Sequence, residues 1–102
     1  MAAVVWTEPA LADLDAIADY IALDNAPAAR ALVRKVFAHI DHLESLPDSG
    51  SFPPELDGKR YRQIVEPPCR VIYRHEKQEG TVYVLHVVRS ERQLRPSSLH
   101  GG

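Results

Sequence analysis

The sequence has one cysteine, one tryptophan and no long apolar run. The single Cys69 cannot form a disulfide within the chain, which favours a reducing, cytoplasmic location. It precedes a valine-rich run, so we expect a buried structural thiol more than a reactive nucleophile. No apolar stretch approaches the roughly 20 residues that a membrane-spanning helix needs. The first residues lack the basic flank and apolar core of a secretory signal, so we expect none.

The composition, 45% hydrophobic and 25% charged, is typical of one globular domain. We assign residues 1–96 to that domain and residues 97–102 to a flexible C-terminal tail. His39 and His42 have a spacing that can hold a metal on a helix, but no third ligand is indicated nearby. The sequence therefore predicts neither a metal site nor a cofactor.

Charge is distributed unevenly along the chain. Residues 1–58 carry three basic and ten acidic side chains, whereas residues 59–102 carry nine basic and four acidic ones. This separation creates an oriented field on a small domain. We interpret the basic half as a face for an anionic partner, either an acidic peptide, an acidic protein surface or a nucleic acid. The alternative is that two solvated faces merely differ in composition.

Two amphipathic helices are predicted in the first half of the chain. Apolar residues recur at helical spacing over residues 8–22, where Thr7 can cap the helix and Pro9 fits its first turn. A second helix is predicted over residues 27–46, with Pro27 near its first position. Because the connection is short, the two helices should form an antiparallel hairpin.

Strands are predicted on both sides of this hairpin, in segments rich in β-branched and aromatic residues. The segments are residues 4–6, 61–65, 69–75 and 81–88. The order β-α-α-β-β-β defines an α+β fold: an N-terminal strand, the helical hairpin and a three-stranded antiparallel meander forming one sheet. The helices should pack on one face of that sheet.

Alternation along residues 69–75 places Val71 and Tyr73 on one face of the sheet, with Arg70 and Arg74 on the other. If the helices cover the first face, the second is partly open to solvent. We expect arginines there, and just after the last strand, to form one concave basic surface that holds carboxylates or phosphates. The candidates are Arg62, Arg70, Arg74, Arg89, Arg92 and Arg95.

The segment Cys69-Arg70-Val71-Ile72-Tyr73-Arg74 and several shorter ones resemble the ParE branch of the RelE/ParE toxins of bacterial type II toxin–antitoxin systems. The likeness extends over residues 4–92, and its most specific part is Cys69-Arg70-Val71-Ile72-Tyr73-Arg74. The other segments are Trp6-Thr7, Tyr20-Ile21-Ala22, residues 25–29, Gly58-Lys59-Arg60 and residues 82–89.

Two activities divide the toxins that this chain resembles. RelE-like members resemble ribonucleases that cleave messenger RNA on the ribosome, which requires a base, an acid and cations for the developing phosphate charge. Arg70 matches an arginine of that set, and Arg89 or Arg92 matches a second. However, residues 61–63 lack the alternating lysines, and residues 93–96 lack the expected Tyr or His.

The resemblance therefore implies a poison of DNA gyrase that acts by binding rather than by its own catalysis. Ribosome-dependent cleavage of messenger RNA is the alternative. In that alternative His86 and Arg70 are the catalytic candidates, because His86 is the one plausible general base on the sheet. A packed, hydrogen-bonded strand histidine is the other interpretation of His86.

The resemblance also implies an acidic ParD-like antitoxin that folds on binding. We expect an antitoxin helix along the helical hairpin, in a groove formed by Leu14, Ile17, Ile21, Val33 and Phe37. The residues expected to bind the target or the antitoxin are Arg60, Arg62, Arg70, Tyr73, Arg74, Arg89 and Arg92. A non-toxic DNA-binding subunit is a weaker alternative, because the first predicted helix carries four acids and no base.

Overall fold

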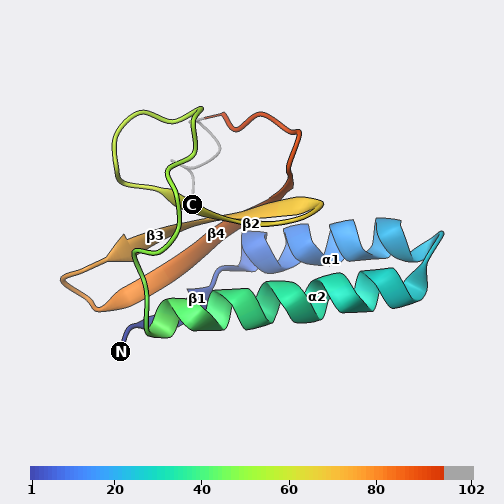
Figure 1. The fold of residues 1–102 in the computed structure, drawn as a ribbon, viewed down its shortest axis with the longest axis horizontal. Helices are drawn as coiled ribbons and strands as arrows, with labels where there is room; N and C mark the ends of the chain where they lie inside the picture. The colour runs from blue at the N-terminus through green and yellow to red at the C-terminus, as the bar shows by residue number, and fades with distance from the viewer. Residues whose placement is uncertain (96–102) are drawn as a thin grey trace.

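A computed structural model describes residues 1–95, and the predicted tail of residues 97–102 lies outside this range. The element order confirms the predicted β-α-α-β-β-β fold (Figure 1). The elements are β1 (Ala3–Trp6), α1 (Glu8–Ala22), α2 (Ala26–Asp41), a 3₁₀ turn (His42–Glu44), β2 (Arg62–Glu66), β3 (Cys69–Glu76) and β4 (Thr81–Arg89). The strand bounds agree with the predicted ones to within one residue. Neither helix is long and apolar enough to cross a membrane within residues 1–95.

Both helices begin where their capping side chains predict. The Thr7 side chain accepts a hydrogen bond from the Ala10 amide at 3.4 Å, and the Asn25 side chain accepts one from the Ala28 amide at 3.0 Å. The second helix ends earlier than predicted, and its last turn is 3₁₀. Pro47 explains part of this difference, because a proline disfavours helical backbone at the preceding residue.

The sheet has the strand order β1-β4-β3-β2, and β2, β3 and β4 form the predicted antiparallel meander. The N-terminal strand β1 joins the same sheet by pairing in parallel with β4, so the sheet is mixed. Ile72 pairs with His86 while Tyr73 pairs with Val84, which leaves Leu85 as the extra residue of a β-bulge.

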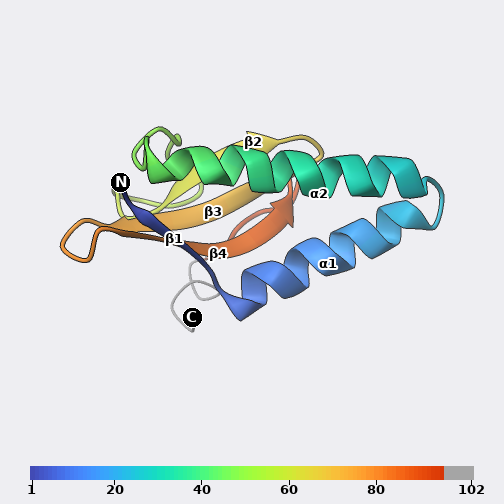
Figure 2. The same cartoon turned by 90° about the horizontal axis from the view of Figure 1, so that it is seen from below.

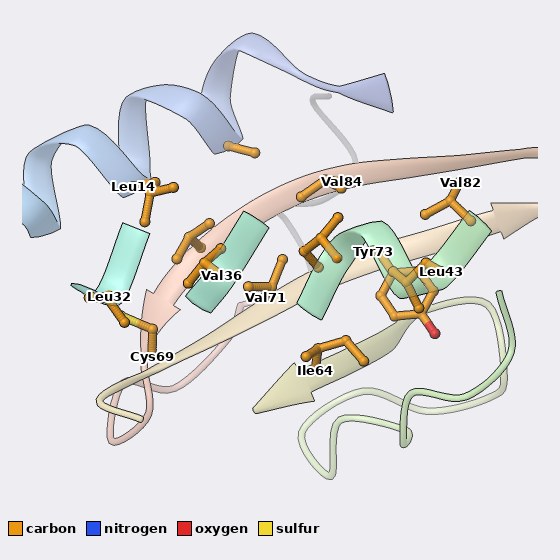
Figure 3. Packing of buried hydrophobic residues seen from close by; sticks show 13 residues of the cluster. Leu14, Leu32, Val36, Leu43, Ile64, Cys69, Val71, Tyr73, Val82 and Val84 are labelled. Atoms are coloured by element: carbon orange, nitrogen blue, oxygen red, sulfur yellow. The ribbon is translucent and has the colours of Figure 1, made fainter. Parts of the chain in front are cut away.

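The helical hairpin covers one face of the sheet, and its turn projects past the sheet (Figure 2). The main hydrophobic core lies between the hairpin and this face (Figure 3). Cys69 belongs to this core and is fully buried, as predicted, and its burial raises the pKa of the thiol. The core includes Leu14, Leu32, Val36, Ile40, Leu43, Val71, Tyr73, Val82 and Val84.

The opposite face of the sheet is covered as well, which corrects the expectation of an open strand layer. Residues 45–61, the loop before β2, and residues 90–95, the C-terminal segment, both lie over this face (Figure 1). Ile72, Leu85 and Leu94 form a second buried cluster beneath them, with Leu56 and Tyr61 packed against it. The sequence does not predict this layer, because a loop carries no periodic pattern that reveals its packing.

The hydroxyl group of Tyr73 anchors the 45–61 loop to the sheet. It donates to the Pro47 carbonyl at 2.9 Å and accepts from the Gly50 amide at 2.9 Å. A Cβ atom on Gly50 would lie 2.6 Å from this hydroxyl oxygen, so only glycine permits the approach. Tyr73 is fully buried, and therefore its predicted role as a partner-binding residue is wrong for this structure.

We predict that Tyr73→Phe lowers the free energy of unfolding by about 1–3 kcal/mol, because it leaves the Gly50 amide and the Pro47 carbonyl without their partner. Tyr83→Phe is the matched control, since its hydroxyl bonds Glu79 at an exposed position, and we expect it to change stability by less than about 0.5 kcal/mol. Urea unfolding measures both. Equal stability of the two variants would contradict the anchoring role.

Candidate functional site

The predicted arginines do not form one concave surface, and Arg70 shows why. Its side chain is buried, and its guanidinium forms a bidentate ion pair with Glu55, in which Nη1 lies 2.8 Å from Oε1. The same guanidinium donates to Gln63 Oε1 at 3.0 Å and to the Arg92 carbonyl at 2.6 Å. Its Nε is the one buried side-chain polar atom without a partner within residues 1–95. The expected exposure of Arg70 is therefore wrong.

The Arg70–Glu55 pair joins three segments of the chain. Glu55 lies in the 45–61 loop and also accepts the Leu94 amide at 3.1 Å, so β3, the loop and the C-terminal segment meet at this carboxylate. The hydrogen bonds from Arg70 lower the pKa of Glu55 from 4.5 to about 2. Hydrogen bonding to Glu55 in turn raises the pKa of Arg70. The pair is a structural lock, not an open anion site.

Two other predicted arginines on the strands interact with their neighbours. The Arg62 guanidinium donates to the Gly50 carbonyl at 2.8 Å and lies 4.4 Å from the Phe52 ring centre. Arg74 pairs with Glu76 at 2.8 Å and stacks on a tyrosine ring. The remaining loop arginine, Arg60, lies 5.6 Å from the ring centre of Tyr61. All three guanidinium groups are therefore engaged in contacts with neighbouring residues of the chain.

Arg89 lies on the helical side of the sheet, away from Arg70. It is paired in register with Cys69, whose side chain belongs to the core beneath the helices. The Arg89 guanidinium stacks 4.6 Å from the ring centre of Tyr20, a strongly exposed residue of α1. The basic residues expected on one face are thus divided between several regions, because a β-bulge and two covering segments intervene.

A polar hollow lies beside the outer edge of β4, where β1 has ended. The pairing of β1 with β4 stops at Val84, and beyond it the α1 residue Asp13 takes the place of a strand. Its Oδ2 accepts the Val87 amide at 3.1 Å and lies 3.0 Å from Nδ1 of His86. The hollow has a volume of about 410 Å³, and the residues that line it include Asp13, His86, Arg92, Gln93 and Arg95.

A second hollow region follows the seam between α1 and α2. Two adjoining hollows of about 450 and 360 Å³ share Ala18 and Val33, so together they form one apolar groove, here called the hairpin groove. Acidic residues of α1 stand on one rim and basic residues of α2 on the other, with no ion pair between the rims within residues 1–95. The rim residues are Asp15, Asp19, Arg30 and Arg34.

Three of the five residues predicted for an antitoxin groove line the hairpin groove: Leu14, Val33 and Phe37. Leu14 forms its buried floor, whereas Ile17 lines a different hollow, beside Tyr20 and Arg89. Ile21 packs against the core and lines neither part of the groove. The prediction missed the small side chains that hollow out the seam, although the alanine content of both helices signals them. These are Ala12, Ala18, Ala22, Ala26 and Ala29.

Metal binding finds no support among residues 1–95, where no three His, Cys, Asp or Glu side chains come together as ligands would. Beside the polar hollow, Asp13 and His86 form an oriented acid–base contact.

Comparisons with known proteins agree with this architecture. Residues 4–94 match the family described as the ParE toxin of the type II toxin–antitoxin system parDE. The chain is 35% identical to Toxin RelE2 of Caulobacter vibrioides, over 90% of this chain and 99% of that protein. A structure of the chromosomal ParDE system from P. aeruginosa aligns with a TM-score of 0.71 and 26% identity, covering 89% of this chain and 98% of the other.

The toxin–antitoxin complex RelBE2 of Mycobacterium tuberculosis shares the fold, with a TM-score of 0.54 and 22% identity over 86% of this chain and 96% of the other. Fold and comparisons together define the class as the type II toxins of the RelE/ParE superfamily. Within that class, the chain belongs to the ParE toxin family. The family resemblance expected from the sequence is confirmed.

We predict that Glu55→Gln destabilises the fold by about 3–5 kcal/mol at pH 7, because it leaves the Arg70 charge buried and unpaired. Glu76→Gln is the matched control: it breaks the more exposed pair with Arg74, for which a loss of less than about 1 kcal/mol is expected. Denaturant unfolding at pH 7 measures both variants.

The same substitution should alter how the free energy of unfolding depends on pH at acidic pH. A folded pKa of about 2 for Glu55, below its ordinary 4.5, contributes stability that is present above pH 4.5 and lost as the pH falls towards 2. The loss is on the order of 3 kcal/mol for the wild type. Glu55→Gln should lack this pH-dependent contribution. If the variant loses as much stability as the wild type between pH 4.5 and pH 2, the Arg70–Glu55 pair does not hold the fold together in this way.

Proposed function

We propose that this toxin acts by binding DNA gyrase and trapping it with its DNA cut, rather than by cleaving RNA. The observation that carries the proposal is the state of Arg70. In the ribonuclease alternative this arginine must meet a phosphate, but its guanidinium is buried and bonded to Glu55, Gln63 and the Arg92 carbonyl. The match to the ParE family over residues 4–94 supports the same choice.

The absence of lysines from the second strand supports the proposal further. β2 carries Arg62 and Gln63, and neither is an exposed lysine that could stabilise a developing phosphate charge. A poison needs complementarity to its target instead of a proton-transfer set. An arginine that stacks on an exposed aromatic ring, as Arg89 does on Tyr20, suits a protein interface, where both residue types are enriched.

The proposal predicts that the purified toxin, mixed with gyrase and supercoiled plasmid, accumulates linear or nicked plasmid once the enzyme is denatured. Plasmid with toxin but without gyrase is the control, and it should stay supercoiled. In cells, induction of the chain alone should raise a DNA-damage response while messenger RNAs stay intact. A plasmid that remains fully supercoiled with gyrase present would count against the proposal.

Messenger RNA cleavage is the second candidate, and one contact favours it. Asp13 lies 3.0 Å from Nδ1 of His86, an arrangement that can orient an imidazole for proton transfer, and Arg92 and Arg95 line the same hollow. If ribosome-bound messages are cut on induction and His86→Gln abolishes the cuts, this candidate replaces gyrase inhibition.

We also propose that an acidic, ParD-like antitoxin neutralises the toxin by laying a helix in the hairpin groove. A groove between antiparallel helices accepts the apolar side of an amphipathic helix. Charge complementarity requires that the helix present acidic residues to Arg30 and Arg34 and basic residues to Asp15 and Asp19. The ParDE and RelBE2 structures that this chain resembles are toxin–antitoxin systems, which supports a partner of this kind.

Ala18→Glu should weaken antitoxin binding at least tenfold, because Ala18 lines both halves of the groove and the new carboxylate would lie under an apolar helix. Ala38→Glu, at an exposed position of the same hairpin outside the groove, is the matched control. Titration calorimetry with the ParD-like antitoxin measures the affinity, and rescue of growth on co-expression gives a cellular readout. Equal effects of the two variants would exclude the groove as the docking site.

A further inference from the structure

The C-terminal end of β4 and the segment after it carry an unusual set of basic side chains. Arg89, Arg92 and Arg95 are spaced three residues apart, and together with His86 they are here called the β4 strip. Arg92 and Arg95 are exposed, and neither forms an ion pair within residues 1–95. This distinguishes them from Arg62, Arg70 and Arg74, which each have an acidic partner.

The local charge of the β4 strip is opposite to that of the whole chain. The chain has a formal net charge of −2, whereas residues 86–95 contain three arginines and a single acid, Glu91. The nearest carboxylate of α1, on Asp13, accepts the Val87 amide and contacts His86, so it is already engaged. The strip is therefore a positively charged region beside an acidic helix.

The hollow beside the strip has the polar lining that a phosphate needs. Its volume is about 410 Å³, and Arg92, Arg95 and Gln93 supply donors around it. Two residues three positions apart are separated by at most about 11 Å, and each strand of duplex DNA carries one negative charge per about 3.4 Å of the helix axis. Both arginines can therefore meet phosphates of one strand segment.

Arg89, the first arginine of the strip, lies on the helical side of β4, where it contacts Tyr20. The Tyr20 ring is exposed and lies 4.6 Å from the Arg89 guanidinium, over a shallow hollow that it shares with Ala16 and Ile17. An arginine fixed on an aromatic ring loses less side-chain entropy when it binds a phosphate oxygen. The strip thus has one guanidinium group held against Tyr20 on the helical side of β4, and two, those of Arg92 and Arg95, beside the polar hollow.

We infer that the β4 strip binds the phosphate backbone of duplex DNA. This extends the proposed action on gyrase, an enzyme that holds cut DNA: the toxin contacts the DNA as well as the protein. Asp13 of α1 borders the hollow beside the strip and repels phosphates, so the DNA must approach from the C-terminal end of β4 and not across the helix.

The test is binding of a fluorescein-labelled 20-base-pair duplex to the toxin, measured by fluorescence anisotropy at several salt concentrations. Arg92→Glu/Arg95→Glu should bind at least tenfold more weakly. Loss of two phosphate contacts should reduce the salt slope by about 1.8, because each contact contributes about 0.9. Lys35→Glu/Lys59→Glu makes the same charge change at exposed positions elsewhere, and it should keep most of the affinity.

Three outcomes overturn the inference. The first is equal affinity of the strip variant and the wild type. The second is an equal loss in the lysine control, which would indicate a general charge effect. The third is tighter binding of the wild type to a single-stranded RNA of the same length or to a poly-glutamate peptide. Thermal unfolding of both variants excludes misfolding as the cause, since all four substituted positions are exposed.

Failure of this inference and failure of gyrase inhibition are distinguishable. If the wild type traps gyrase but the strip variant binds free duplex normally, the DNA contact is wrong and the proposed function stands. If the wild type binds duplex through the strip but never produces cut plasmid with gyrase, the DNA contact stands and the proposed target is wrong.

Discussion

The buried ion pair between Arg70 and Glu55 holds two segments over one face of the sheet, and so determines which side chains of the sheet remain accessible to a partner. Arg70 projects from the middle strand on the side away from the helices, and Glu55 reaches it from the 45–61 loop. The C-terminal segment joins through the Leu94 amide and the Arg92 carbonyl. A buried pair of this kind adds little net stability over an apolar one, but losing one partner costs several kcal/mol. Its main effect is to hold two irregular segments in one arrangement.

That arrangement determines which basic groups remain accessible. The loop and the C-terminal segment cover one face of the sheet. The accessible charged side chains therefore lie at the edge of β4 and on the helical hairpin. The two regions that we propose for binding therefore differ in chemistry. The hairpin groove is apolar with charged rims, whereas the β4 strip is polar and basic. If both proposals hold, two partners would bind without competing for the same atoms.

Much of the fold followed from the sequence alone. Helical periodicity, capping at Thr7 and Asn25 and β-branched strands are local signals, and the structure agrees with them closely. The meander also followed, since short turns join consecutive strands. The parallel pairing of β1 with β4 had no local signal, because it joins residues almost eighty positions apart. Such long-range pairings are set by the packing of the completed core.

The candidate site was harder to predict than the fold. Alternation correctly separated Arg70 from Val71 and Tyr73, but it gave no information on what lies above Arg70. Glu55 is a single acid in a proline-rich loop, and nothing in its neighbourhood marks it as the partner of a strand arginine. The hairpin groove was predicted from its large apolar residues, although alanines create the hollow itself. Sequence patterns do not show how an irregular segment packs, or where small side chains leave a hollow between helices.

The position of β1 has a consequence for how the toxin is made. The strand that leaves the ribosome first pairs with the strand that leaves last, between Ala3–Trp6 and Thr81–Val84. During synthesis β1 therefore remains unpaired while the helical hairpin and the meander emerge from the ribosome. The sheet is complete only once β4 has been synthesised, so a prematurely terminated chain ending before β4 lacks the edge beside which the β4 strip and the Asp13 contact form.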